Sequence, residues 1–320
     1  MTTTRDNHNK PVAALTGGTG FIGRCLAAKL QTAGWRVRAL VRSTSRAAQI
    51  TQLAGAELVS GDLEQVTGLR RLVQGADAVI HCAGAVRGVT PAQFDRVNVD
   101  GVQRIAQAAR EQACLPRLIC LSSLAAREPR LSPYAASKHK GEQALVDAAG
   151  EMTWAALRPP AVYGPGDREL LPLFRLMAHG FAPLPTTPRA RFSVIYVDDL
   201  ANAVLCWLDA AAPATGIFEL HDGRVGGYCW DDVIRIVQQL TGRPVRRIRV
   251  PLPLLRLPAA VNWVAGQLLP YAPMLTPGKI RELRHSDWVC DNQRIQQAVD
   301  WQPKVDLAEG LRRTPGWRPA

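Results

Sequence analysis

The glycine-rich sequence TGGTGFIG at residues 16–23 constrains the fold of this chain more than any other stretch. It follows a short apolar run that is typical of a buried strand, and it opens a stretch with helical periodicity. At such a junction the first glycine makes the turn, the second lets a pyrophosphate approach the backbone, and the third lets the helix pack on the sheet. Gly17, Gly20 and Gly23 therefore predict a dinucleotide-binding loop, completed by the N–H groups of the helix N-terminus.

The alternation of strand-like and helical stretches continues along the first half of the chain. Strands are predicted at 36–42, 56–62, 77–84 and 117–123, with helical stretches between them such as 98–113. This alternation predicts an α/β fold, a doubly wound parallel sheet of the Rossmann type with helices on both faces. Right-handed crossovers place the strand ends, and therefore any ligand, along one edge of that sheet.

After about residue 165 the alternation loosens and proline and glycine become frequent. We expect a nucleotide-binding Rossmann domain made of residues 11–165 plus about 192–222, because strand and helix patterns return in the second range. A smaller, interleaved C-terminal substrate lobe is expected from about 166–191 plus 223–320. The polar residues 1–10 predict a flexible tail.

The composition limits the classes of ligand. The 320 residues carry a net charge of +12, but the arginines are spread along the chain, and helix-turn-helix or zinc-finger spacings are absent. We therefore expect a phosphate-bearing small ligand or a membrane surface as partner, and no nucleic acid.

The cysteines and the first residues indicate a compartment. The seven cysteines show no Cys-x-x-Cys spacing, and several lie in apolar runs, such as Cys120. Buried reduced thiols predict a reducing compartment and no metal site. The first ten residues lack the apolar core of a signal peptide. Together these features predict a cytoplasmic protein.

The stretch 250–275 is apolar along its whole length. Pro251, Pro253, Pro258 and Pro270 break it, and Arg256 and Asn262 interrupt it, so a membrane span is not expected. A helix that packs under the second lobe and caps an apolar pocket is favoured over an interfacial membrane helix. Membrane association through this segment stays open as the alternative.

The ends of the predicted strands indicate which dinucleotide binds. An NAD site usually has an acid near the end of the second strand, where this chain has Arg42 and Ser43. Because an arginine can pair with a 2′-phosphate, NADP(H) is favoured over NAD(H). Asp62, at the end of the third strand, is placed to accept from the adenine amino group, and Ala83 and Gly84 leave room for the cofactor's backbone.

Tyr134 and Lys138 are four residues apart on a predicted helix and therefore share one face. Ser122 and Ser123 precede them at the end of a predicted strand, on the ligand edge of the sheet. A ketone reduced by hydride needs a proton at its oxygen, and tyrosine gives it more easily when a nearby ammonium lowers its pKa from about 10. These residues predict a proton-transfer site in which a serine hydroxyl holds the substrate oxygen.

Eight motifs follow one another between residue 12 and about 205. They are TGGTGFIG, GDL, HCAGA, VNVDG, SSLAA, YAASK, RPPAVYGPGD and VIYVDDLANAV. In this order they resemble the short-chain dehydrogenase/reductase superfamily, in its extended or atypical branch with the NAD-dependent epimerase/dehydratases. The C-terminal segment SDWVCDNQRIQQAVDWQPKVDLAEGLRRT is similar to that family's ending, so the resemblance covers nearly the whole chain.

The resemblance implies that Tyr134 is the acid/base and that Lys138 lowers its pKa and binds the nicotinamide ribose. Ser123 matches the serine that holds the substrate oxygen, with Ser122 as the alternative. Asn98 matches an asparagine that braces the central helix. The residues predicted to bind the cofactor, ending with two at its nicotinamide end, are Gly17, Thr19, Gly20, Phe21, Ile22, Gly23, Arg42, Asp62, Leu63, Ala83, Gly84, Lys138, Pro159 and Val162.

The substrate class is indicated by the short stretch between Ser123 and Tyr134, which sugar-nucleotide members usually have longer. This stretch is more similar to hydroxysteroid dehydrogenases and to reductases of 3-oxo-sphingoid or ceramide intermediates. The leading hypothesis is an NADP(H)-dependent oxidoreductase acting on a carbonyl or hydroxyl of a hydrophobic substrate, steroid-like or a long-chain 3-oxo lipid. The alternatives are a sugar-nucleotide epimerase or dehydratase with tightly bound NAD, and a non-catalytic nucleotide-binding module.

Two predicted helices, 98–113 and 134–150, are rich in alanine. Small side chains suit close helix packing, either in a homodimer or against the chain's own sheet. The sequence leaves both arrangements open.

Overall fold

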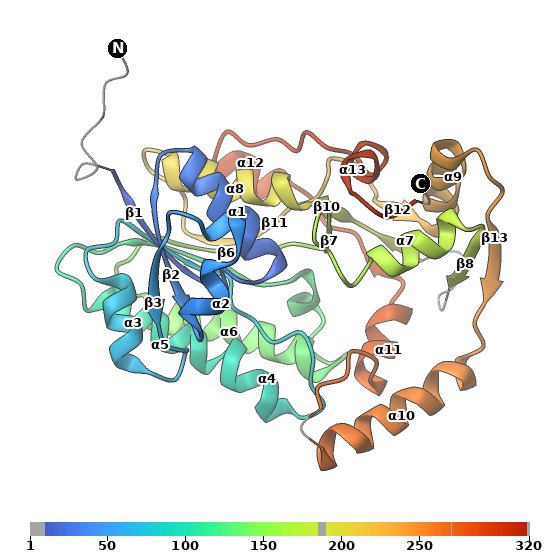
Figure 1. Ribbon diagram of the computed structural model, residues 1–320, viewed down its shortest axis with the longest axis horizontal. Helices are drawn as coiled ribbons and strands as arrows, with labels where there is room; N and C mark the ends of the chain where they lie inside the picture. The colour runs from blue at the N-terminus through green and yellow to red at the C-terminus, as the bar shows by residue number, and fades with distance from the viewer. Residues whose placement is uncertain (1–9, 185–189, 270, 319–320) are drawn as a thin grey trace.

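The computed structural model describes residues 10–184, 190–269 and 271–318, so the tail predicted for residues 1–10 lies outside the described residues except for Lys10. Seven strands form one parallel sheet in the order β11-β6-β5-β4-β1-β2-β3 (Figure 1). The bounds are β1 Val12–Thr16, β2 Arg36–Val41, β3 Glu57–Ser60, β4 Ala78–His81, β5 Arg117–Leu121, β6 Trp154–Arg158 and β11 Gly216–Glu219.

The strand order reverses direction at β1, because the chain proceeds to β2 and β3 on one side and returns to β4 on the other. A crevice at such a switch point is where ligands bind in this architecture. The predicted doubly wound parallel sheet is confirmed. The strands predicted at 77–84 and 117–123 end two to three residues earlier than expected, because their last residues belong to the loops of the ligand edge.

Helices cover both faces of the sheet, and every residue of β1 is buried because successive side chains enter opposite cores. Ala13 and Leu15 pack with one set of helices, and Val12 and Ala14 pack with the other. The first face carries α1 Phe21–Thr32, α8 Val197–Asp209 and α12 Gln293–Ala298. The second face carries α3 Val66–Val73, α5 Asp100–Arg110 and α6 Pro133–Ala149.

A third core lies in the later part of the chain. It joins α7 Leu171–Ala178, α9 Trp230–Thr241 and α13 Leu307–Arg313 through buried side chains such as Phe174, Val237 and Leu311. Short strands pair around it: β7 with β10, β8 with β13, and β12 and β14 with β9. Their bounds are β7 Ala161–Tyr163, β8 Phe181–Leu184, β9 Arg191–Phe192, β10 Val194–Tyr196, β12 Tyr228–Cys229, β13 Arg246–Arg249 and β14 Asp287–Trp288.

One of the remaining helices lies in the apolar stretch 250–275, where prolines were expected to interrupt the chain. The remaining helices are α2 Thr44–Ala48, α4 Pro91–Asn98, α10 Leu252–Leu268 and α11 Pro277–Arg284, with 3-10 turns at Thr51–Leu53 and Leu124–Arg127. Pro258 lies inside α10 without ending it, contrary to the expectation that prolines break this stretch. The carbonyl that loses its partner, four residues earlier, belongs to exposed Leu254, where water can bond it. Pro270 lies outside the described residues.

Within the described ranges, no helix combines the length and the hydropathy that crossing a membrane requires.

His81 ends β4 in the centre of the sheet and is 1% exposed. Its Nδ1 lies 2.9 Å from the Thr16 Oγ1. Burial, followed by the positive charge of Lys138, lowers the pKa of His81 to about 3. The imidazole therefore stays neutral in the folded protein over a pH range where the unfolded chain binds a proton.

We predict that His81 makes the free energy of unfolding fall as the pH drops below about 6.5, its pKa in the unfolded chain. Between that value and the folded pKa of about 3, only the unfolded chain binds this proton. The loss should be about 1.4 kcal/mol per pH unit. In denaturant unfolding at about pH 7.5 and about pH 5, the wild type should lose about 2 kcal/mol more than His81→Gln. Equal losses would contradict this assignment.

Candidate active site

The glycine loop between β1 and α1 has no room for side chains. Gly17 has φ +72°, and a Cβ there would lie 2.6 Å from the backbone N of Ala83. A Cβ on Gly23 would lie 2.1 Å from the Gly17 carbonyl oxygen. The N–H of Gly20, the N-cap of α1, donates to that same carbonyl over 2.9 Å. This bare backbone cradle fits a dinucleotide pyrophosphate.

The first turn of α1 adds to this cradle. Phe21 and Ile22 are the first two residues of α1, and no acidic side chain lies in that turn to satisfy its N–H groups. The exposed Thr19 precedes the helix, and its carbonyl oxygen accepts from the Arg24 Nε over 2.9 Å. The turn is therefore suited to an anion at the helix N-terminus.

The predicted strand-end residues lie along the ligand edge of the sheet. Arg42 follows β2 directly and is exposed. One carboxylate oxygen of Asp62 accepts the N–H groups of Glu64 and Gln65 over 2.8 and 3.1 Å, so this side chain also fixes its own loop. Leu63 is partly buried and packs against the second core. Only one Asp62 oxygen is thus left for an adenine amino group.

Asn98 ties the loop after β4 to α6. It accepts the N–H of Ala85 over 2.8 Å, donates back to the Ala85 carbonyl over 3.0 Å, and donates to the Ser137 hydroxyl over 2.9 Å. A Cβ on Gly84 would lie 3.0 Å from the Lys138 Nζ. The loop therefore lies directly against the lysine, with Asn98 as the brace between them.

Local sequence explains why α6 begins where it does. Ser132 is the N-cap, and its hydroxyl accepts the N–H of Ala135 over 2.9 Å, while Pro133 occupies the first turn. Tyr134 is the second residue of the helix, and Lys138 follows one turn later at the expected four-residue spacing. The buried Lys138 ammonium donates to the Leu121 carbonyl at the end of β5 over 2.9 Å.

The two adjacent serines face different partners. The Ser122 hydroxyl donates to the buried Glu142 carboxylate over 2.5 Å, and Arg158 donates two hydrogen bonds to that carboxylate over 2.8 and 2.6 Å. The Ser123 hydroxyl accepts the N–H of Ala125 and lies close enough to Tyr134 to lower the pKa of its phenol. The geometry therefore brings Ser123, Tyr134 and Lys138 together and directs Ser122 away from them.

Burial is the main cause of the shifted pKa values of Tyr134 and Lys138. It raises the pKa of Tyr134 to about 12, with the Ser123 hydrogen bond lowering it and the Glu282 carboxylate raising it further. Burial also lowers the pKa of Lys138. Desolvation of the phenolate therefore outweighs the effect of Ser123, and the Lys138 ammonium is directed at the Leu121 carbonyl.

Tyr134 lines a cavity of about 340 Å³ between the sheet edge and the later part of the chain. Most of its wall is apolar, and one side is polar. The ring of Tyr134 meets Phe94 edge-on at 6.0 Å between centroids. The lining residues are Val86, Gly88, Val89, Phe94, Ser132, Pro133, Tyr134, Trp263, Pro273, Met274, Thr276, Pro277, Gly278, Lys279, Arg281 and Glu282.

The polar side of this cavity was not anticipated from the sequence. The buried carboxylate of Glu282 accepts from the Ser132 hydroxyl and pairs with the Lys279 ammonium over 2.9 Å. That ammonium lies 6.0 Å from the centroid of the Tyr134 ring. Lys279 and Glu282 lie on α11, far along the chain from α6, so no local pattern could have linked them to Tyr134.

The two residues predicted at the nicotinamide end lie after β6. Pro159 is buried, and its carbonyl oxygen accepts the N–H of Leu124 over 2.9 Å. Val162 lies in β7, opposite Ile195 of β10, and packs against the first core. Both are next to the strand ends that carry the serines.

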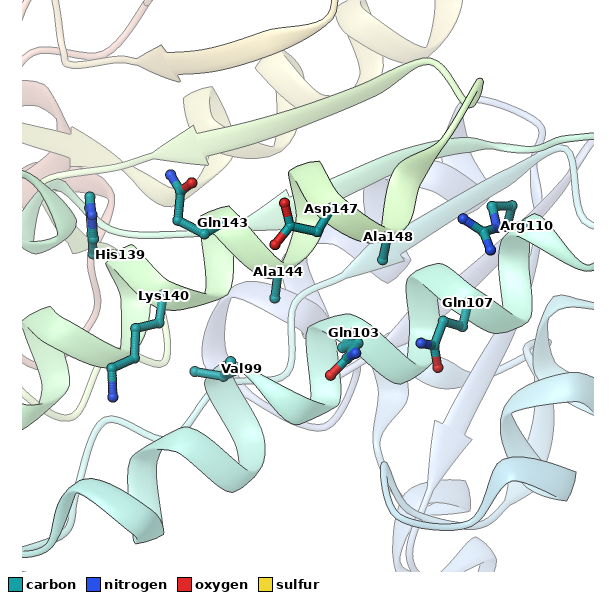
Figure 2. A pocket seen from close by; sticks show the side chains of 10 residues that line it. All are labelled: Val99, Gln103, Gln107, Arg110, His139, Lys140, Gln143, Ala144, Asp147 and Ala148. Carbon is teal, nitrogen blue, oxygen red and sulfur yellow. The ribbon is translucent and has the colours of Figure 1, made fainter.

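A larger hollow of about 460 Å³ lies elsewhere, on the outer side of α5 and α6 (Figure 2). It is lined by polar side chains such as Gln103, Arg110, His139 and Asp147, and Tyr134 is not among them. The smaller cavity is the candidate substrate site because Tyr134 lines it. The alanine-rich face predicted for a homodimer lies on these same two helices.

Comparison with known proteins supports the resemblance expected from the motifs. The NAD dependent epimerase/dehydratase family model matches residues 13–220. A ceramide reductase from Caulobacter vibrioides is 39% identical over 306 residues, covering 96% of this chain and 94% of that protein. The decarboxylating sterol-4-alpha-carboxylate 3-dehydrogenase of Schizosaccharomyces pombe is 27% identical over 292 residues, covering 81% and 83%.

Among solved structures, the Bordetella bronchiseptica enzyme WbmG in complex with NAD has a TM-score of 0.73 and 18% identity, covering 99% of this chain and 96% of that one. At this identity the likeness supports the fold alone.

We predict that alanine at Ser123 lowers the rate of catalysis, whereas alanine at Ser122 lowers the stability of the fold. Ser123→Ala should lower kcat for carbonyl reduction by about 100-fold, because one donor to the developing oxyanion is lost. Ser122→Ala should keep kcat within about threefold, but it should lower the free energy of unfolding by about 1 kcal/mol through the lost bond to Glu142. Steady-state kinetics and denaturant unfolding of both variants test this. The reverse pattern would make Ser122 the substrate serine.

Proposed function

The chain is an enzyme of the NAD-dependent epimerase/dehydratase family, and on this premise we propose that it is an NADPH-dependent ketone reductase. Its proposed substrate is a long-chain 3-oxo lipid of the ceramide type, with a steroid-like ketone as the second member of the same class. The observation that carries this proposal is the cavity beside Tyr134, whose wall is apolar except for one polar side. Such a cavity suits an acyl chain next to a polar head.

The polar side fits the head of a ceramide-like lipid better than a sugar nucleotide. Glu282 and the paired Lys279 offer an acceptor and a donor to hydroxyl and amide groups. A sugar nucleotide needs uncommitted cations for its diphosphate. Arg191, one of two arginines in the sequence PRARF at 188–192, gives its guanidinium to the Gly226 and Gly227 carbonyls.

Arg189, the other member of that pair, lies outside the described residues. The ceramide reductase similar to this chain over nearly its whole length supports the lipid alternative.

The proposed proton path uses the three residues that the sheet edge brings together. When bound at the glycine loop, NADPH supplies the hydride that reduces the carbonyl carbon. The Tyr134 phenol donates its proton to the carbonyl oxygen, and the Ser123 hydroxyl holds that oxygen beside it. A phenol whose pKa is about 12 is protonated at neutral pH, which is the form that donates a proton during carbonyl reduction.

Lys138 and the residues around the glycine loop would hold the cofactor. The lysine ammonium has three donors and gives one to Leu121, which leaves two for ribose hydroxyls. Gly17, Gly20 and the first turn of α1 would bind the pyrophosphate. Arg42, exposed after β2, would pair with the 2′-phosphate, which favours NADP(H) over NAD(H).

We predict net oxidation of added NADPH when the protein is given a 3-oxo ceramide or another long-chain 3-oxo lipid. Absorbance at the NADPH band should fall with these substrates and not with a sugar nucleotide. Tyr134→Phe should slow turnover by about 10²–10⁴-fold while NADPH still binds, because only the proton donor is removed. A purified protein that carries NAD and never consumes it overall would contradict this function and favour an epimerase. Unchanged cellular activity of Tyr134→Phe would favour a non-catalytic role.

We predict that Arg42→Asp shifts cofactor preference. Binding of NADPH should weaken by about 1.5–3 kcal/mol through loss of a charge-assisted pair, while NADH binding changes far less. Arg36→Asp is the matched control, because Arg36 is an exposed arginine at the opposite end of the same strand. Titration of both cofactors by fluorescence measures the effect. Equal weakening of the two cofactors by Arg42→Asp would exclude the 2′-phosphate role.

A further inference from the structure

Helix α10 presents an uncovered apolar stripe. Leu254, Leu257, Val261, Val264 and Leu268 recur at spacings of three and four residues, so they lie on one face of the helix. Each of these side chains is between 49% and 78% exposed. Figure 1 shows α10 at the periphery of the molecule beside α11. A contiguous exposed stripe of this kind is an interaction surface and not a core face.

The opposite face of α10 is attached to the rest of the molecule. Gly266 is buried, and a Cβ there would lie 2.7 Å from the Val89 side chain and 3.1 Å from Pro273. The Asn262 side chain donates to the Leu275 carbonyl over 3.1 Å. The helix is therefore held with its apolar stripe directed outward.

The charge around this stripe is mainly positive, although Arg247 and Lys279 pair with the flanking Asp231 and Glu282. Residues 233–281 contain eight lysines and arginines and no aspartate or glutamate. Arg246 and Arg249 are exposed in β13, which leads into α10, and Arg256 is exposed between two members of the stripe. An anionic surface therefore complements this region, and each basic residue near such a surface adds to binding.

This charge also argues against a second copy of the chain as the occupant. A two-fold interface places the same patch on both partners. Arg256 and its neighbours would then face other arginines, and no acidic residue in 233–281 is available to pair with them. The exposed aromatic side chains of Trp263 and Tyr271 lie beside the stripe, and such residues prefer the boundary between water and hydrocarbon.

We propose that α10 and the exposed arginines around it form a docking surface for an anionic lipid bilayer, on which α10 lies flat with its stripe in the hydrocarbon boundary. The surface is continuous with the cavity, since Trp263 of α10 lines the same cavity as Tyr134. Docking therefore places the cavity at the bilayer where a lipid ketone resides. This link to substrate delivery rests on the proposed function, whereas the docking itself does not.

Flotation with vesicles tests the docking. The wild type should float with vesicles of equal parts phosphatidylglycerol and phosphatidylcholine, and less with phosphatidylcholine alone. Binding should weaken at about 0.5 M salt, where charge attraction is screened. Leu257→Glu/Val261→Glu should lower the vesicle partition coefficient by about tenfold or more, since it removes apolar area and adds repulsive charge. Val225→Glu is the matched control, because Val225 is 92% exposed and lies away from α10.

Three outcomes would overturn the proposal: no flotation of the wild type, equal partition of the α10 variant and the wild type, or an equal loss in Val225→Glu. Sedimentation velocity without vesicles tests whether a second copy of the chain binds the stripe instead. If the α10 variant converts a dimer to a monomer and still floats normally, the stripe binds a second copy.

Measuring the reduction of a water-soluble short-chain 3-oxo substrate tests the proposed function independently of membrane docking. The α10 variant should keep that activity. A wild type that floats and reduces no 3-oxo compound would leave the docking surface standing and reject the reductase.

Discussion

The site depends on the parallel pairing of the seven strands. Because all strands run the same way, the ends of β1, β4 and β5 meet at one edge, and their connecting loops must pass one another there. The loops approach closely where Gly17 meets Ala83 and where Gly84 meets Lys138, and a Cβ at either glycine would require its neighbour to shift. The lysine hydrogen bond to the Leu121 carbonyl then fixes α6 to the same edge. The glycines, the lysine and the tyrosine are therefore positioned by one architectural requirement.

Much of this edge could be predicted from the sequence because it depends on short spacings. Gly17 and Gly23 serve a single strand–helix junction, and Tyr134 and Lys138 are separated by one helical turn, so local periodicity places them. The choice between Ser122 and Ser123 could not be predicted, because successive side chains of extended backbone point in opposite directions and the register decides which faces α6. Glu282 could not be placed at all, since only tertiary packing brings α11 to Tyr134.

Helix α10 shows that a sequence pattern does not always predict which face of a helix is buried. Its stretch is apolar on nearly every position, so periodicity does not identify which face is buried. The sequence favoured packing under the second lobe, and the structure has α10 attached through Gly266 and Asn262 while its stripe of leucines and valines is exposed. Small or polar residues such as Gly266 and Asn262 make internal contacts, whereas the leucines and valines of the stripe are exposed. Hydrophobicity alone therefore predicted a helix here but not its orientation.

The electrostatics of the cavity connect its polar side with the proton donor. Glu282 lies close enough to raise the pKa of Tyr134, and its own charge is balanced by Lys279, whose ammonium lies near the tyrosine ring. A hydroxyl or amide of a bound lipid that engaged Glu282 would compete with the Ser132 and Lys279 hydrogen bonds. In the proposed function, Glu282 and Lys279 therefore contribute both to head-group recognition and to the electrostatic environment of the proton donor.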